Sequence, residues 1–326
     1  MAEPGAQGSH VQEPTDQGAA VGGPEGLPHV DVIIATHHRP ELLKVALDAV
    51  WSQSYEGPIR CTVVYDRAEP DPSIERTSAN REVRVITNTR TPGLAGARNS
   101  GILATSGELV AFCDDDDEWL PTKVERQVAA LEGNDALTAV TGIVIAYGDH
   151  ETSRVPRQND VTLEQLVRRR VMEAHPSTVM VRRTALLGPI GLVDEEIPGS
   201  YGEDYDWIIR AARAGSFAVV DEPLVRVLWG QSLFSSKWQT IRDATDYMIA
   251  KHPEFRADPL AMSYQNGRRA FAAAALGHRR EALREAWQVA RSNPKERRAY
   301  LAAAVALRLV SADRLMAMAH RRGRGI

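Results

Sequence analysis

Cysteine is nearly absent from this sequence. Only Cys61 and Cys113 occur among 326 residues, each inside an apolar run that predicts a buried strand. Two such cysteines do not make the closely spaced disulfide framework that stabilises small secreted proteins. We therefore expect free thiols in a reducing compartment, which predicts a cytoplasmic protein.

Long apolar runs are absent as well. No stretch approaches the roughly 18 consecutive apolar residues that a membrane-spanning helix needs. The N-terminus has no basic start followed by an apolar core, so the sequence predicts no secretory signal. Hydrophobic residues still make up 43% of the chain, which is enough to form a sizeable core. A soluble globular protein is therefore expected.

Large apolar side chains are scarce at the beginning of the chain. Residues 1–28 are rich in Gly, Pro, Glu and Gln, a composition that cannot offset the entropy cost of ordering, so we predict that they are disordered. Order is expected from His29 onward. Strand and helix patterns alternate in residues 29–235, whereas residues 236–326 are predicted to be helical and basic.

The alternating region is typical of an α/β fold. Each β-branched run ends in polar residues and is followed by a helical pattern, as in 94–107, where we expect Gly107 to close the helix. The predicted strands are 29–36, 59–66, 82–87, 108–113, 137–148 and 177–183. This order implies a mostly parallel mixed sheet flanked by helices, with ligands bound beyond the carboxyl ends of the strands.

The stretch AFCDDDDEW, residues 111–119, places four adjacent aspartates at the end of a predicted strand. Adjacent carboxylates repel one another where water is scarce, so the cluster predicts a bound cation. Oxygen ligands arranged as Asp-x-Asp suit Mg²⁺ or Mn²⁺, which shares its remaining positions with the oxygens of a diphosphate. The alternative is an acidic helix start, in which Asp117 caps a helix opened by Trp119-Leu120-Pro121.

Three segments together resemble the family 2 glycosyltransferases, which have the GT-A fold. They are VIIATHHRPELLKVALDAVWSQ, GLAGARNSGILATSGELVAFCDDDDEWLPTKVERQ and GEDYDWIIRAARAG, in the order and spacing of that family. The resemblance extends from Val30 to Leu233 and leaves a helical C-terminal extension. It implies a hexosyltransferase-type enzyme that transfers a sugar, with inversion, from a nucleoside diphosphate sugar to an acceptor hydroxyl. A UDP-linked donor is expected, within polysaccharide or glycoconjugate biosynthesis.

The resemblance also implies which residues bind the donor. Arg98 and Asn99 would bond the diphosphate or sugar oxygens, although Arg98 could instead pair with a neighbouring acid. Tyr65 stands where the family commonly has an acid, so the base of the donor stays open. The residues expected to hold the nucleoside are Ala35, Thr36, Arg39 and Asp66.

Metal and catalytic residues follow from the same resemblance. Asp116 would be the main metal ligand, with Asp114 as a second, and Asp114 or Asp115 would reach the ribose. Inversion requires a base for the acceptor proton, and Asp204 matches the family's base. Glu203 would orient Asp204 or touch the acceptor. Alternatively, both acids only cap the helix start.

Two other functions are open. A nucleotidyltransferase also uses strand-end carboxylates and Mg²⁺, but ATHHRPE stands where its glycine-rich basic loop should follow the first strand. A catalytically inactive nucleotide-sugar-binding protein is the second, and intact Asp116 and Asp204 disfavour it.

Farther along, Arg226 matches a family arginine, while Trp229 stands near the place of a histidine found in many relatives and suits either a sugar face or the core.

Acidic residues are scarce near the C-terminus. From Gln265 onward we count 14 Lys or Arg against 4 acids, although the whole chain carries a formal charge of -4, which argues against nucleic acid as a partner. The basic region suits an anionic inner membrane face, beside a lipid-linked, saccharide or small-molecule acceptor. It equally suits a solvated surface with Glu281 and Glu285 as partners, or a homodimer through Leu307, Val310 and Leu315.

Overall fold

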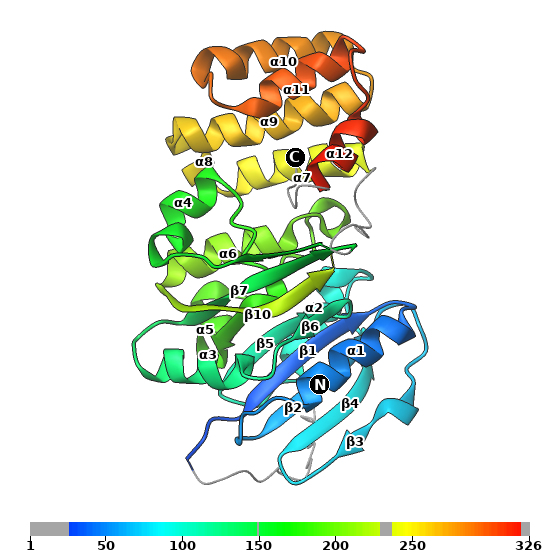
Figure 1. Cartoon of the computed structure of the whole chain (residues 1–326), viewed down its shortest axis with the longest axis vertical. Coiled ribbons are helices and arrows are strands. Elements are labelled where there is room, and N and C mark those ends of the chain that lie inside the picture. The colour runs from blue at the N-terminus through cyan, green and yellow to red at the C-terminus, as the bar shows by residue number, and fades with distance from the viewer. Residues whose placement is uncertain (1–25, 149, 229–236, 321–326) are drawn as a thin grey trace, which may run out of the picture.

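The computed structural model describes residues 26–148, 150–228 and 237–320 (Figure 1). Of the residues 1–28 that are predicted to be disordered, 1–25 lie outside these ranges, as does Trp229 with its predicted role. Order begins slightly before His29, because the Tyr55 hydroxyl donates a 2.6 Å hydrogen bond to the Pro28 carbonyl. The α/β expectation is confirmed over the described residues.

Ten strands form one mixed sheet with the order β3-β4-β2-β1-β5-β9-β7-β10-β6, and β8 pairs with β7. The strands are β1 (Val30–Thr36), β2 (Ile59–Tyr65), β3 (Arg76–Thr77), β4 (Arg81–Thr87), β5 (Leu109–Asp114), β6 (Asp117–Trp119), β7 (Thr138–Tyr147), β8 (His150–Arg154), β9 (Val179–Arg182) and β10 (Phe217–Leu228).

Four neighbouring strands, β4-β2-β1-β5, run parallel. β1 lies between β2 and β5, in a register that sets Ala35 beside Asp114. The sheet changes direction at β9, which is antiparallel to both β5 and β7. Because parallel strands end at the same edge, the polar ends of β1, β2 and β5 meet there.

Twelve helices are described. They are α1 (Pro40–Trp51), α2 (Leu94–Leu103), α3 (Lys123–Glu132), α4 (Leu163–Arg168), α5 (Arg183–Ala185), α6 (Glu203–Ala214), α7 (Trp238–Lys251), α8 (Pro253–Ala257), α9 (Pro259–Ala275), α10 (Arg279–Ser292), α11 (Arg297–Ala306) and α12 (Ala312–His320).

Helices cover both faces of the sheet. Val32 and Ile34 of β1 point to the core beneath α1 and α3, whereas Ile33 points to the core beneath α2 and α6. This alternation follows from the two-residue period of a strand. Both cores are built from apolar residues, which explains why the buried strands read as nearly continuous hydrophobic runs.

The C-terminal helices stack on α6, at the end of the molecule opposite β3 and β4 (Figure 1). A third core joins α4 and α6 to α7–α9 and contains Tyr205, Met248 and Phe255. A fourth, rich in alanine, joins α9, α10 and α11. Glu281, whose side chain is 32% exposed, pairs with Arg242 of α7, and Glu285 lies 3.6 Å from Arg269 of α9, so both acids have arginine partners on neighbouring helices.

Two helix boundaries differ from the prediction. Trp119 ends the short strand β6, which pairs with β10. Helix α3 starts only at Lys123, so Pro121 is not the first residue of this helix and Asp117 does not cap it. Helix α2 ends at Leu103, before Gly107. Gly107 has another role, because a Cβ there would lie 2.5 Å from the His29 carbonyl oxygen.

Candidate active site

The ends of β1 and β5 meet at an acidic corner. The Thr36 hydroxyl donates a 2.7 Å hydrogen bond to Asp115. Arg39, just before α1, pairs with Asp116 at 2.8 Å and with Asp115 at 3.3 Å. Thus the nucleoside residues predicted on β1 and the predicted metal ligands lie in one place. Ala35 lies beside Asp114 in the sheet.

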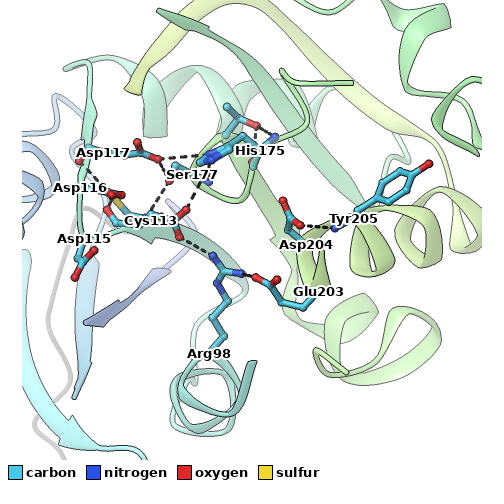
Figure 2. Close-up of polar contacts among 12 residues, drawn as sticks. Arg98, Cys113, Asp115, Asp116, Asp117, His175, Ser177, Glu203, Asp204 and Tyr205 are labelled. Atoms are coloured by element: carbon cyan, nitrogen blue, oxygen red, sulfur yellow. Dashed lines mark hydrogen bonds and ion pairs between the residues drawn. The ribbon is translucent and has the colours of Figure 1, made fainter. Parts of the chain in front are cut away.

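Arg98 of α2 connects this corner to the start of α6. Its guanidinium pairs with Asp114 at 2.6 Å and with Glu203, and only 6% of its side chain is exposed (Figure 2). A cation with two carboxylate partners stays charged even when buried. Arg98 therefore holds the predicted metal corner and the predicted catalytic pair in a fixed relation.

Asp117 and His175 face Asp114 from the other side. Ser177 donates a 2.5 Å hydrogen bond to the buried Asp117 carboxylate. The His175 ring lies with Nδ1 3.4 Å from Asp117 and Nε2 3.8 Å from Asp114. Asp114, Asp117 and His175 each offer one ligand atom, and these atoms all lie within 4.8 Å of one another. This donor set fits a divalent cation such as Mn²⁺ or Mg²⁺.

The site contains more carboxylates than guanidinium groups. Its guanidinium groups belong to Arg39, Arg98 and Arg170. Its carboxylates belong to Asp114, Asp115, Asp116, Asp117, Glu203 and Asp204. Burial and the neighbouring aspartates raise the pKa of Asp116, and burial raises the pKa of Asp115. This excess of negative charge favours binding of a cation.

Glu203 and Asp204 open α6 in different surroundings. Burial raises the pKa of Glu203, although Arg98 opposes it. Burial would also raise the pKa of Asp204, but Arg170, Arg98 and His175 outweigh it and the pKa is lowered. Arg170, which follows α4, is the direct ion-pair partner of Asp204. Asp204 is therefore ionised at neutral pH.

Two predicted donor residues are engaged elsewhere. Asp66 accepts hydrogen bonds from Asn88 at 2.8 Å and from the Gly93 backbone at 3.0 Å. Asn99 exchanges 2.8 Å hydrogen bonds with the backbone of Val193 and is 1% exposed. Both side chains fasten loops beside the acidic corner, which gives each of them a structural role.

The sequence interpretation missed three contributions to the site. It identified neither His175 nor Arg170 as a metal or catalytic residue, and it considered Asp117 only as a helix cap. No sequence signal joins His175 to the distant aspartates or Arg170 to Asp204. Arg226 lies outside the acidic corner and pairs with Glu151 at 2.9 Å.

Comparison with protein families gives one match, to Glycosyl transferase family 2, over residues 31–187. A glycosyltransferase from Haemophilus influenzae, described as uncharacterized, is 24% identical over 216 residues, which cover 62% of this chain and 66% of that protein. The Escherichia coli protein WfgD, named UDP-Glc:alpha-D-GlcNAc-diphosphoundecaprenol beta-1,3-glucosyltransferase, is 25% identical over 122 residues, covering 37% and 46%. The chain therefore spans less than two thirds of both relatives.

A solved structure shares the fold over nearly the whole chain. TarS residues 1–349 from S. aureus, in complex with UDP-GlcNAc, superposes with a TM-score of 0.58 at 16% identity and covers 91% of this chain and 92% of that one. Together with the family match, this agreement identifies the mixed sheet and its flanking helices as the GT-A fold.

Proposed function

We propose that this chain, whose residues 31–187 match the Glycosyl transferase family 2 model, transfers a hexose from a UDP-sugar to an acceptor hydroxyl with inversion. The observation that carries the proposal is the acidic corner at the ends of β1 and β5, where Asp114, Asp115 and Asp116 gather beside Thr36. A UDP-linked donor is supported by the UDP-GlcNAc complex of TarS and by UDP-Glc in the name of WfgD.

The acidic corner would hold Mn²⁺ or Mg²⁺. Asp114, Asp117 and His175 are near enough to one another to share one ion. Asp116, the ligand implied by the family pattern, lies beside them and pairs with Arg39. When bound, the ion supplies positive charge that stabilises the departing diphosphate.

Asp204 is the base in this proposal. The acceptor oxygen forms its bond to the anomeric carbon opposite the departing diphosphate, and its proton passes to an Asp204 carboxylate oxygen. Glu203 is less suited, because its partner Arg98 also pairs with Asp114 and so ties the Glu203 carboxylate to the acidic corner. Glu203 and Arg98 thus position the two halves of the site. The nucleoside would bind at the ends of β1 and β2, which carry Ala35, Thr36 and Asp66, the last already hydrogen-bonded to Asn88 and Gly93.

A thermal-shift and transfer assay tests the proposal. Wild type should gain stability from UDP only when Mn²⁺ is present, and Asp116→Ala should remove that gain. Asp204→Asn should keep the gain but lose transfer by ~100-fold or more, as expected for loss of a general base. Asp221→Asn changes an exposed carboxylate of β10 and should match wild type in both assays.

Other outcomes would replace the proposal. Mn²⁺-dependent UDP binding without hydrolysis or transfer of any UDP-sugar would indicate a binding protein. Release of pyrophosphate from a nucleoside triphosphate would indicate a nucleotidyltransferase. Wild-type turnover by Asp204→Asn would remove Asp204 from the mechanism.

We also propose that the C-terminal helices contact an anionic membrane surface. Arg280, Arg284, Trp287 and Arg291 share the exposed face of α10, and Trp287 is 66% exposed. Tyr300 on α11, and Leu307 and Leu309 just after it, are also exposed apolar residues of the C-terminal helices. Among the described helices, none is both long and apolar enough to cross a bilayer. A lipid-linked acceptor, as named for WfgD, would then be met at the membrane. Homodimerisation through Leu307, Val310 and Leu315 is the alternative use of this surface.

A further inference from the structure

A group of basic and aromatic side chains lies between Asp204 and the C-terminal helices. We call it the junction cluster. It consists of Arg170 after α4, Tyr201 before α6, Tyr264 and Arg268 on α9, and Arg298 on α11. Tyr264, Arg268 and Arg298 lie outside residues 31–187, so the family match does not account for them.

Arg268 is a half-buried cation without an acidic partner. No carboxylate among the described residues forms an ion pair with its guanidinium. Its Nη1 donates a 3.3 Å hydrogen bond to Gln265, and its Cζ lies 5.6 Å from the centre of the Tyr201 ring. Partly burying a guanidinium without a counter-charge costs free energy, which a bound anion would recover.

The surroundings of Tyr264 indicate a positive electrostatic potential beside Arg268. The Arg298 Cζ lies 4.4 Å from the centre of its ring. Burial alone would raise the pKa of Tyr264, but Arg298, Arg268 and Arg170 outweigh burial and the pKa is lowered. The neighbouring carboxylates, Glu296 at 2.9 Å from Arg298 and Asp204 beside Arg170, do not cancel this potential.

Two buried donors, one in the cluster and one on Gln265, which contacts Arg268, have no acceptor among the described residues. Gln265 is 0% exposed, and its Nε2 has no hydrogen-bond partner among the described residues. The buried Nε of Arg298 also lacks one. Buried donors of this kind are normally satisfied, so an acceptor-rich ligand would complete them.

We propose that the junction cluster binds a phosphate or diphosphate group of the acceptor, while Asp204 meets the acceptor hydroxyl. Several guanidinium groups around one anion suit phosphate, which offers more acceptor oxygens and more charge than a carboxylate. Arg170 belongs to the cluster and also pairs with Asp204, so the anion subsite adjoins the base. The assignment of the anion to the acceptor rests on the proposed function.

Calorimetric titration in EDTA buffer tests the subsite without metal-dependent donor binding. The probes are butyl-diphospho-N-acetylglucosamine, glycerol 3-phosphate and the neutral butyl N-acetylglucosaminide. Wild type should bind the diphosphate at least ~10-fold more tightly than the neutral glycoside, the difference expected for charge-assisted hydrogen bonds. Glycerol 3-phosphate binding as tightly as the diphosphate would assign the subsite to a phosphomonoester acceptor, and weaker binding to a glycosyl diphosphate. Either result supports the subsite.

The variant Arg268→Gln should reduce diphosphate binding by ~10-fold and leave the neutral glycoside unchanged. Arg126→Gln removes the same charge from an exposed position on α3 and should bind all three probes as wild type does. Equal wild-type affinity for the charged and neutral glycosides, or undiminished diphosphate binding by a folded Arg268→Gln, would overturn the subsite. UDP binding with Mn²⁺ is measured separately, so a failed donor assay with an intact subsite would reject only the proposed function.

Discussion

At the residue scale, Glu203 and Asp204 are adjacent carboxylates whose pKa values move in opposite directions. Burial dominates at Glu203 and raises its pKa, whereas Arg170, Arg98 and His175 together outweigh burial at Asp204 and lower its pKa. Opposite shifts in neighbouring acids are a common way to separate their roles. The ionised Asp204 can accept a proton, and its pairing with Arg170 makes it a weaker base.

Replacing Arg170 tests this relation. In Arg170→Met the pKa of Asp204 should rise, because its direct counter-charge is lost. A base works only when deprotonated, so the acid limb of the kcat profile should move to higher pH, by about one unit for a lost ion pair. The measurement is transfer between pH 4 and 8.

Arg169→Met is the matched control for this prediction. Arg169 pairs with Asp160, and 52% of its side chain is exposed. Its acid limb should coincide with that of wild type. If the acid limbs of both variants coincide with that of wild type, Arg170 does not lower the pKa of the base.

At the element scale, Asp206 joins α6 to the C-terminal helices by ion pairs. The buried Asp206 carboxylate lies 2.8 Å from His252, 2.7 Å from Lys251 and 2.9 Å from Arg210. Lys251 ends α7 and His252 precedes α8, so this one carboxylate ties the helix bearing Glu203 and Asp204 to the C-terminal helices. The position of the base therefore depends on elements beyond the family match.

Asp206→Asn should destabilise the protein by about 3–5 kcal/mol, the usual cost of leaving buried charges without a partner. Burial opposes ionisation, but His252, Arg210 and Lys251 hold the pKa of Asp206 well below its usual range. The stabilisation is therefore complete above the unfolded pKa of about 3.9 and is lost as the pH falls toward the folded value.

Urea unfolding of wild type and Asp206→Asn between pH 3 and 7 checks this prediction. The gap in unfolding free energy should stay constant above about pH 5 and shrink below it. Asp243→Asn, an exposed α7 carboxylate bonded to Gln239, is the control and should cost little. A gap that widens on acidification would contradict the assignment.

At the scale of the whole molecule, acidic and basic groups are separated. The acidic corner lies in the sheet, whereas α10 and α11 lie at the far end of the molecule (Figure 1). Glu281 and Glu285 of α10 pair with Arg242 and Arg269 of neighbouring helices, and Glu296, just before α11, pairs with Arg298. The exposed arginines of the outer surface therefore dominate its charge.

Vesicle flotation tests the membrane proposal. Wild type should float with phosphatidylglycerol-containing vesicles and not with pure phosphatidylcholine. Because each arginine near an anionic surface contributes about 1 kcal/mol, Arg280→Gln/Arg284→Gln/Arg291→Gln should weaken binding by roughly 100-fold. Replacing the exposed Lys44, Arg126 and Arg169 with Gln is the control with the same charge change. The surface would instead be assigned to a homodimer if the protein does not bind vesicles, sediments as a dimer, and becomes a monomer in the Leu307→Glu variant.

The sequence by itself determined the elements of this protein and the residues of its acidic corner. Strand and helix periods are local, and β-branched runs ending in polar residues identify both a strand and the edge where it ends. Thr36 and Asp114–Asp117 could therefore be placed together without coordinates. The short strand β6 was missed because its pairing with β10 is a distant contact.

Only the tertiary structure decided the partners within the site. Arg98 binds Glu203 across 105 positions of sequence, and Arg170 meets Asp204 across 34. His175 joins Asp117, and Arg268 faces Tyr201, through the same kind of contact. Such pairs leave no periodic signal, because they arise where separate helices and strands pack, and packing is specified by the whole chain rather than by neighbouring residues.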